Sequence, residues 1–441
     1  MTVFRRLQTF AEGGNSIRVA VVGAGFVGRA LVHQINLTPA MEPSLLISRK
    51  PEAGVEAFTK AGFAGSEVLV SDDPSDLDEA IGAGRRCVSP APWVLEDLHT
   101  IDVAVEATGD VEHGALVALA ALSGGIHVVS LNYETDATVG PLLAHFARRQ
   151  GVVYTGSDGD QPGVMMRLVE YARGIGLEVT AAVNCKGFLD VHATPETIAP
   201  WSERQGTSLK MTTAFTDGTK MNVENCCVAN ATGLAVDRRG MIGVETTLDR
   251  ALEDFADAMG QPGIVDYTLG GDFGSGVFVI ATGAHPELAA PYLQYLKMGP
   301  GPDYLFFRPW HLVQLETPLS IAEAVLDRGP TIAPSGGPRA RVVTITKRHL
   351  EAGHQLDDIG GFDHYGEVDN FDQTEGLLQV GVAAGAVLRR EVQIDQPLSL
   401  DDVELDESRP ILKLLAAQAM IFDSPDLPHP ELASVWNSVH P

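Results

Sequence analysis

Residues 17–28, IRVAVVGAGFVG, constrain the fold of this chain more than any other segment. Ile and Val dominate the first six residues, and Gly23, Gly25 and Gly28 follow at the spacing GxGxxG before an amphipathic run over residues 29–35. In a strand–turn–helix context these glycines permit a tight turn, a close approach of a pyrophosphate to the backbone, and close packing of helix on strand. The helix N-terminus adds free N–H groups for phosphates. We therefore expect a dinucleotide-binding domain; the alternative is a glycine-rich turn that binds nothing.

The end of the next predicted strand indicates which dinucleotide is bound. The sequence LLISRK ends at Ser48, Arg49 and Lys50, about 20 residues after Gly28, where NAD enzymes usually place an acid for the ribose 2′-hydroxyl. Two cations would instead pair with a 2′-phosphate, which favours NADP(H) over NAD(H). The alternative is that both are solvated loop cations. The expected cofactor contacts are Gly23, Gly25, Phe26, Val27, Gly28, Ser48, Arg49, Lys50, Thr108, Gly109 and Asn132.

Charge and length exclude some classes of partner. The formal net charge of the 441 residues is −27, which argues against binding of nucleic acid or of an anionic membrane surface. No apolar run reaches the ~20 residues of a membrane helix, and the first residues lack the apolar stretch of a secretory signal. The four cysteines show no metal-binding spacing. We therefore expect reduced thiols and a cytoplasmic protein with a small-molecule substrate.

The order of strand and helix patterns predicts an α/β chain of three domains. Residues 1–160 alternate the two patterns, as a doubly wound Rossmann domain requires. Residues 161–328 carry strand patterns with hairpin signals, which predict an antiparallel α+β catalytic and oligomerisation domain. Within it, residues 208–226 are expected to form a hairpin that turns at Asp217 and Gly218.

A Pro- and Gly-rich linker at residues 329–338 precedes the third expected domain, a β-rich module over residues 338–422. The chain repeats itself weakly there, and the corresponding positions recur at the same offset, Leu350 and Leu356 as Val392 and Leu398. This repeat predicts a small pseudo-symmetric module.

Two helical patterns lie outside this simple order. The sequence SIAEAVLD at residues 320–327 predicts a helix that returns the chain to the first domain. The apolar sequence ILKLLAAQAMIF at residues 411–422 predicts a short helix that packs elsewhere on the protein or on a second subunit.

The chain also resembles a known group of bacterial oxidoreductases. The resemblance rests on the glycine fingerprint, EATG, LNYETDATVGP, GSDGDQP, ATPE, FTDGTKM, ANATGL, GIVDY, FFRPWHL and the repeated C-terminal module, and it covers nearly the whole chain. The group comprises homoserine-dehydrogenase-like proteins with a C-terminal SAF domain, including the 1-deoxy-D-xylulose-5-phosphate reductoisomerase-like (DXR-like) enzymes. The resemblance implies a Rossmann domain, a catalytic α+β domain, a SAF domain, NADPH as reductant and a homo-oligomer.

The resemblance also implies a reaction, that of the DXR-like members. DXR-like members isomerise and reduce 1-deoxy-D-xylulose 5-phosphate to 2-C-methyl-D-erythritol 4-phosphate, a step of isoprenoid biosynthesis. Homoserine dehydrogenases carry a lysine directly after the Asn that ends the corresponding strand, whereas VVSLNY places Tyr133 there. This departure weakens a literal homoserine dehydrogenase interpretation.

Carbonyl reduction needs a group that donates a proton or stabilises an oxyanion. Lys186 ends an otherwise apolar strand, where burial would lower its pKa, and is the first candidate; the alternative is an ordinary strand-end lysine. Asp158 and Asp160 flank a glycine beyond a strand end and could share a proton or orient substrate, or merely form a turn. Glu134 lies in the same region of the predicted sheet edge.

Other polar residues are candidates for substrate binding. Asn184 precedes Lys186 on the same strand, and Arg308 and His311 lie in FFRPWHL, where a buried structural histidine is an equal alternative. A divalent cation would help a reductoisomerase, but no spacing of acids identifies its ligands, so the metal stays open.

Three functions remain in competition at this point. The first is an NADPH-dependent oxidoreductase for a small polar hydroxycarbonyl compound, with or without a phosphate, of which the DXR-like reaction is the sharpest version. The second is a dehydrogenase or reductase of another aldehyde or semialdehyde. The third is a non-catalytic, nucleotide-binding regulatory protein. The sequence does not name the substrate, the direction of the reaction or the oligomeric state.

Overall fold

The computed structural model describes residues 2–283, 285–423 and 429–440. The chain forms two compact units, and each is built from separate stretches of sequence. Unit 1 comprises Met1–Asp160, Leu312–Ala333 and Ser408–Pro441. Unit 2 comprises Gln161–His311 and Pro334–Glu407. The residues expected to form a third domain are thus divided between the two units, and their independent folding stays a prediction.

Unit 1 is built on a seven-stranded sheet of order β3-β4-β2-β1-β5-β6-β7, and all its neighbouring strands are parallel. Its strands are β1 Ile17–Val22, β2 Met41–Ile47, β3 Leu69–Val70, β4 Cys87–Ser89, β5 Val103–Glu106, β6 His127–Ser130 and β7 Tyr154–Gly156. The order reverses direction between β1 and β5, because β1 pairs with β2 on one side and with β5 on the other. The expected doubly wound α/β domain is therefore present.

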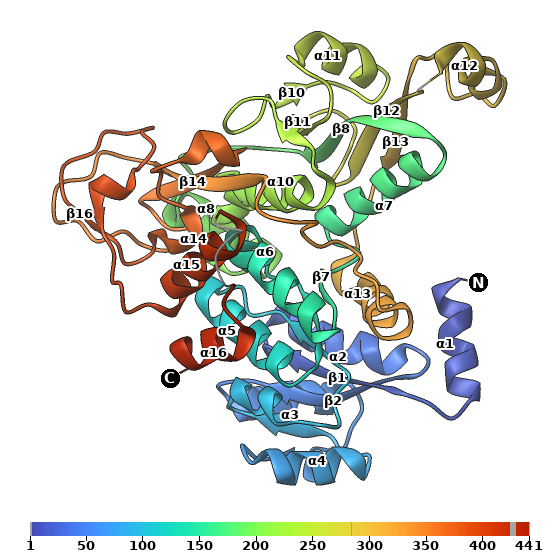
Figure 1. Ribbon diagram of the computed structural model, residues 1–441, viewed down its shortest axis with the longest axis vertical. Helices are drawn as coiled ribbons and strands as arrows, with labels where there is room; N and C mark the ends of the chain where they lie inside the picture. Colours follow the sequence, from blue (N-terminus) through green and yellow to red (C-terminus); the bar gives the residue numbers. More distant parts are fainter. Residues whose placement is uncertain (1, 284, 424–428, 441) are drawn as a thin grey trace. The chain divides into compact units, whose positions relative to one another are not determined.

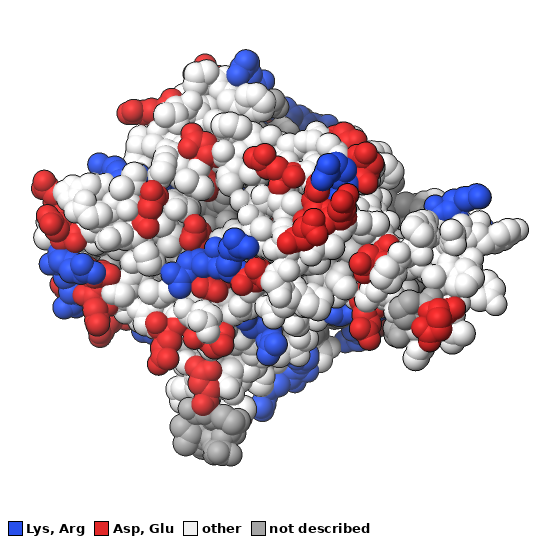
Figure 2. Space-filling view, turned by 90° about the horizontal axis from the view of Figure 1, so that it is seen from above, with Lys and Arg blue, Asp and Glu red and all other residues white. Residues whose placement is uncertain are grey.

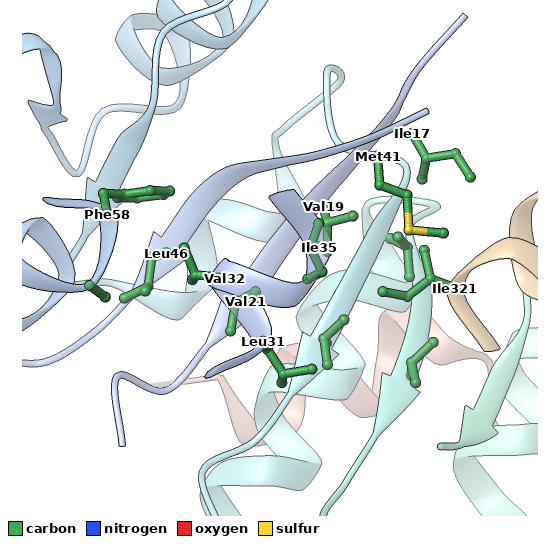
Figure 3. Packing of buried hydrophobic residues seen from close by; sticks show 14 of the residues in the cluster. Ile17, Val19, Val21, Leu31, Val32, Ile35, Met41, Leu46, Phe58 and Ile321 are labelled. Carbon is green, nitrogen blue, oxygen red and sulfur yellow. The ribbon is translucent and has the colours of Figure 1, made fainter. Parts of the chain in front are cut away.

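Helices cover both faces of this sheet. They are α1 Val3–Glu12, α2 Phe26–Leu37, α3 Pro51–Lys60, α4 Pro74–Gly82, α5 Val111–Ser123, α6 Tyr133–Gln150, α13 Val313–Ala322, α15 Pro410–Phe422 and α16 Leu432–Val439. Figure 3 shows buried Leu31, Val32 and Ile35 of α2 packed against the side chains of β1. The apolar face that the sequence places on this helix thus forms the core of unit 1, and Ile321 of α13 joins the same cluster.

Residues 312–333 return the chain to unit 1, as the helical pattern at residues 320–327 predicts. α13 is followed by a π-helical turn at Glu323–Asp327, and Ile332 then bridges β7 at Gly156. The predicted helix at residues 411–422 is also observed, as α15. Figure 1 shows α15 and α16, in red, beside α5 and α6 of the same unit.

Unit 2 contains a mixed six-stranded sheet rather than the antiparallel sheet expected from the sequence. Its main order is β10-β11-β8-β12-β13, with β9 paired to β11. The strands are β8 Leu177–Lys186, β9 Ala235–Val236, β10 Val244–Glu245, β11 Ile264–Leu269, β12 Val277–Gly283 and β13 Asp303–Arg308. β8 pairs in parallel with β11 and antiparallel with β12. Hairpin signals alone do not reveal a parallel pairing, because it joins segments far apart in sequence.

The expected hairpin at residues 208–226 is wrong, because this segment forms two helices. They are α9 Leu209–Thr216 and α10 Thr219–Thr232, separated by Gly218 at φ 83°. The Asp–Gly pair makes a turn as predicted, but the Asp217 carboxylate accepts a hydrogen bond from the Thr219 N–H at the start of α10. Nearly all of α10 is buried, so its sequence lacks the polar face that identifies a surface helix.

The remaining helices of unit 2 are α7 Gln161–Gly174, α8 Pro195–Gln205, α11 Ala251–Ala258, α12 Pro286–Tyr295 and α14 Val380–Ala383. α10 packs on the C-terminal strands β14 Ala340–Thr346 and β15 His364–Asn370, as Figure 1 shows. The Asn230 side chain of α10 accepts hydrogen bonds from the N–H groups of Arg339 and Ala340, at 2.7 and 3.0 Å. These contacts integrate the β-rich module into unit 2.

The weak C-terminal repeat corresponds to an observed pattern of backbone pairing. Leu350 and Val392, which occupy equivalent positions of the two repeats, bond each other through both N–H groups at 2.9 Å. The same offset relates two further bridges, Ile345–Pro397 and Gln355–Val387. Ile345 and Val387 occupy equivalent positions of the two repeats, and so do Gln355 and Pro397. The short strands β16 Val387–Leu388 and β17 Val403–Glu404 complete the module. The predicted pseudo-symmetric, β-rich arrangement is therefore present.

The surface carries charged side chains of both signs (Figure 2), and the cysteines lie inside the molecule. Figure 2 shows acidic and basic side chains interspersed on the face that it draws. All four cysteines are buried and form no disulfide. Within the described ranges, no helix combines the length and the apolar character that crossing a bilayer demands.

Candidate active site

The carboxyl edge of the unit 1 sheet holds a cavity of about 430 Å³. It lies where β1, β2 and β5 end, which is the point where the strand order reverses and where open α/β sheets bind ligands. Its lining residues are Val22, Gly23, Ala24, Gly25, Ile47, Ser48, Arg49, Lys50, Ala53, Pro90, Pro92, Ala107, Thr108, Asp110 and His113. Six of the expected cofactor contacts thus line one cavity.

The three fingerprint glycines occupy backbone positions with different steric environments. Gly23 has φ 111°, and a Cβ there would lie 2.9 Å from the carbonyl oxygen of Ala107. A Cβ on Gly28 would lie 1.8 Å from the carbonyl oxygen of Gly23, so only glycine lets α2 begin this close to β1. Gly25 precedes α2 and has open space around its Cβ position. The turn therefore exposes backbone N–H groups at a helix N-terminus, as phosphate binding requires.

The loop after β2 brings three polar residues to the cavity. The Ser48 hydroxyl donates to the carbonyl oxygen of Lys50 at 3.0 Å and accepts from the Lys50 N–H at 3.2 Å. This turn holds Arg49 and Lys50 at the wall of the cavity. Ala53 and Asp110 line it as well, so one acid faces the two cations.

A buried acid supports the turn after β5. Glu106 is 1 % exposed, and its carboxylate accepts hydrogen bonds from the N–H of Thr108, at 2.8 Å, and from the Thr108 hydroxyl. Burial raises the pKa of Glu106 to about 7, although the Thr108 and Asn132 hydrogen bonds act in the opposite direction. Glu106 thereby positions Thr108, which lines the cavity.

Other residues expected at this edge do not line the cavity, and they differ in exposure. Asn132 is 1 % exposed; it caps α6 by accepting from the Thr135 N–H at 3.1 Å and donates to the Asp110 carbonyl at 2.9 Å. Phe26, Val27, Gly28, Gly109 and Asn132 are not among the lining residues. Phe26 is 67 % exposed at the start of α2. Their contacts with a cofactor stay predictions.

The predicted carboxylates of unit 1 lie just beyond β7 and at the start of α6. Asp158 and Asp160 are 3 % and 8 % exposed, and the Asp158 N–H donates to the Ser320 hydroxyl at 2.7 Å. The Asp158 carboxylate accepts from the Gly159 N–H at 2.9 Å. Glu134 lies in the first turn of α6. The structure thus gives Asp158 the turn-forming contacts of the alternative interpretation, and a catalytic role stays a prediction.

Unit 2 contains a separate buried polar cluster around the end of β8. Asn184 is fully buried; its side chain donates to Glu224 at 2.8 Å and accepts from Gln161 at 3.0 Å. The Lys186 ammonium lies 5.4 Å from the centre of the Phe215 ring. Burial lowers the pKa of Lys186, whereas the charges of Glu224 and Asp217 raise it. A lysine in this setting is suited to donate a proton.

The two remaining substrate candidates lie at the end of β13. The Arg308 guanidinium is 5.9 Å from the Trp310 ring, and the His311 Nδ1 atom lies 2.7 Å from the carbonyl oxygen of Ser275. Among the described residues, no group of three or more His, Cys, Asp and Glu side chains has the arrangement of a metal site.

Four residues of these sites were not predicted from the sequence. Glu106 and His113 lie in the cavity region of unit 1, and Gln161 and Glu224 belong to the cluster of unit 2. Glu224 lies within the run NVENCCVANAT, where a charged residue in a buried helix is the only signal. A buried acid without a partner is costly, so such a residue indicates a polar cluster.

Comparison with known proteins supports an oxidoreductase. Residues 159–317 match the family described as the catalytic domain of the oxidoreductase DRL. A comparison with curated proteins finds no match. Together with the dinucleotide-binding fold of unit 1, the family match makes this chain an enzyme, an NAD(P)-dependent oxidoreductase.

Three solved structures are distantly similar to this chain. A probable dehydrogenase from Thermotoga maritima is 11 % identical, with a TM-score of 0.42, and the match covers 73 % of this chain and 91 % of that chain. A scyllo-inositol dehydrogenase from Lactobacillus casei, solved with NAD(H) and scyllo-inositol, is 14 % identical with a TM-score of 0.35 and coverages of 61 % and 74 %. A 3-ketoreductase from Actinomadura kijaniata, solved with NADP, is 16 % identical with a TM-score of 0.37 and coverages of 71 % and 90 %. At such low similarity, the ligands named belong to those proteins alone.

Proposed function

We propose that this enzyme uses NADPH to reduce a small polar hydroxycarbonyl compound. The observation that carries the proposal is the position of Ser48, Arg49 and Lys50 on the wall of the cavity at the glycine fingerprint. A 2′-phosphate would form charge-assisted hydrogen bonds with both cations, whereas the 2′-hydroxyl of NADH would not. The pyrophosphate would bind at the N-terminus of α2, beside Gly23 and Gly25.

Lys186 is the proposed proton donor of the reduction. Hydride transfer from the nicotinamide to a carbonyl carbon leaves negative charge on the carbonyl oxygen, which needs a proton or a cation. The Lys186 ammonium supplies both, and Glu224 favours its charged form. Asp158, Asp160 and Glu134 are the proposed partners for substrate hydroxyl groups, and Asn184, Arg308 and His311 for other polar groups.

The sharpest version of this function is the reaction of the DXR-like enzymes on 1-deoxy-D-xylulose 5-phosphate. It is supported by the resemblance in sequence. The match of residues 159–317 supports an oxidoreductase catalytic domain and no particular substrate. A homo-oligomer is part of the same proposal. The competing enzyme function is reduction of another aldehyde or semialdehyde.

Two measurements test the proposal. Dissociation constants should be lower for NADPH than for NADH, and Arg49→Asp should narrow or reverse the preference, because charge-assisted contacts contribute about 1.5–3 kcal/mol each. NADPH oxidation should then be screened with 1-deoxy-D-xylulose 5-phosphate, other phosphorylated ketoses, aldehydes and semialdehydes. Equal affinity for the two cofactors in the parent protein would contradict the cofactor assignment, and turnover of aldehydes alone would favour the competing function.

A further inference from the structure

The cationic end of the unit 1 cavity extends beyond the loop after β2. His113 lines the same cavity as Arg49 and Lys50, and it comes from the first turn of α5. We propose that His113 is a third ligand of the NADPH 2′-phosphate, and that it takes up a proton when the phosphate binds. This inference rests on the proposed use of NADPH and adds a residue that determines cofactor specificity.

Local structure holds the His113 ring at the cavity. The Asp110 carboxylate caps α5 by accepting a hydrogen bond from the His113 N–H at 2.8 Å. This bond fixes the backbone of the first helical turn, and Asp110 itself also lines the cavity. The turn before it is fixed in the same way, since Asn132 donates to the Asp110 carbonyl oxygen at 2.9 Å.

The charges around His113 favour a neutral imidazole in the absence of ligand. Burial lowers the pKa of His113 first of all, the charge of Arg49 lowers it further, and the charge of Asp110 raises it. Lys50 also lines the cavity and adds a second positive charge to its wall. On α5 itself, Glu112 is paired with Arg409 at 3.2 Å, so its charge is largely offset.

A bound phosphate reverses this balance. A phosphate monoester is mainly a dianion at pH 7, since its second pKa is about 6. Placed between Arg49, Lys50 and His113, two negative charges favour the imidazolium form, which donates a hydrogen bond to the phosphate. NADPH binding then takes up a proton, so NADPH affinity decreases as the pH rises from about 6.5 to 8. NADH lacks the 2′-phosphate and shows no such dependence.

Two variants of His113 separate its charge from its titration. Dissociation constants for NADPH and NADH are measured at pH 6.5, 7.2 and 8 for the parent, His113→Gln and His113→Lys. The parent should lose about three- to tenfold in NADPH affinity over this range, since uptake of one full proton corresponds to tenfold per pH unit. His113→Gln should bind NADPH about tenfold more weakly at pH 6.5 and lack the pH dependence, with NADH affinity unchanged. His113→Lys carries a fixed charge, so it should keep the NADPH preference and lose the pH dependence.

Three results would overturn the inference. The first is an equal pH dependence of NADPH affinity in His113→Gln and the parent. The second is an equal loss of NADPH and NADH affinity in His113→Gln, which would place the ring at a part common to both cofactors. The third is retention of the pH dependence by His113→Lys. A parent protein that prefers NADPH but gives any of these results would leave the proposed function intact, whereas equal parental affinities would reject both.

Discussion

Lys186 is a residue whose environment opposes its charge. Burial disfavours the ammonium, and the carboxylates of Glu224 and Asp217 partly restore it. If Lys186 stabilises the developing oxyanion, its interaction strengthens in the transition state, and its loss lowers turnover rather than substrate affinity alone. We expect Lys186→Met to reduce kcat by about 100- to 1,000-fold, as the loss of one such donor typically does.

The measurement for Lys186 is steady-state kinetics with the substrate that the screen identifies. NADPH affinity is the control and should be unchanged, because Lys186 does not line the cavity at the glycine fingerprint. Lys186→Arg keeps the positive charge and should retain more activity than Lys186→Met. Turnover within about threefold of the parent in Lys186→Met, less than 1 kcal/mol on the barrier, would make Lys186 an ordinary strand-end lysine.

Glu106 should make the stability of the fold depend on pH. Its pKa is about 7 in the folded chain against an ordinary value of 4.5, so between these values the folded state holds a proton that the unfolded state has released. The free energy of unfolding therefore decreases as the pH rises through this window. Glu106→Gln stays neutral, so its stability relative to the parent should rise from pH 4.5 to pH 7, by up to roughly 3 kcal/mol. Urea denaturation at four pH values measures this difference; a constant difference would contradict the prediction.

At the scale of elements, one side chain of α15 forms hydrogen bonds with the backbone of α6. Pro141 lies inside α6, and the N–H of the next residue, Leu142, donates to the Gln418 side-chain oxygen at 3.2 Å. The Gln418 amide nitrogen donates in turn to the Thr138 carbonyl at 3.4 Å. Gln418 of α15 therefore bonds to backbone groups of α6 on both sides of Pro141.

Gln418→Leu should destabilise unit 1 by about 1–3 kcal/mol, because it removes two buried hydrogen bonds to the backbone of α6. Thermal or urea denaturation followed by circular dichroism measures the change. Gln418→Glu keeps an acceptor for the Leu142 N–H. It should destabilise unit 1 less at a pH near the pKa of the new carboxyl group than at pH 8, where the carboxylate is a buried charge. An unchanged midpoint in Gln418→Leu would mean that water satisfies both groups.

At the scale of the whole molecule, unit 1 needs residues from three separate parts of the chain. α15 and α16 supply buried Ile411, Leu414, Ile421 and Trp436 to it. A chain that ends after Glu407 loses these side chains, each of which contributes about 1.5–3 kcal/mol when fully buried. We expect a lower melting temperature and weaker NADPH binding, although the cavity residues remain. Differential scanning calorimetry with and without NADPH measures both, and an unchanged melting temperature would show that the helices are peripheral.

Features that depend on neighbouring residues could be predicted without the fold. The glycine fingerprint required a strand, a tight turn and a helix, because a Cβ at Gly23 or Gly28 meets backbone atoms. The cations Arg49 and Lys50 follow their strand directly, so their place at the carboxyl edge could be predicted from the parallel order of the sheet. The repeat that pairs Leu350 with Val392 was visible for the same reason, as spacing along the chain.

Contacts between distant segments could not be predicted in this way, because they form only when the chain folds. His113 joins Arg49 at one cavity, and Glu224 joins Asn184 in one cluster, through folding of segments that carry no mutual signal in the sequence. The helix α10 was mistaken for part of a hairpin because burial on all sides removes the polar face by which a helix is identified. The sequence thus determines local conformation through sterics and periodicity. Burial and long-range hydrogen bonding, which set the charge of Glu106 and Lys186, arise only when the chain has folded.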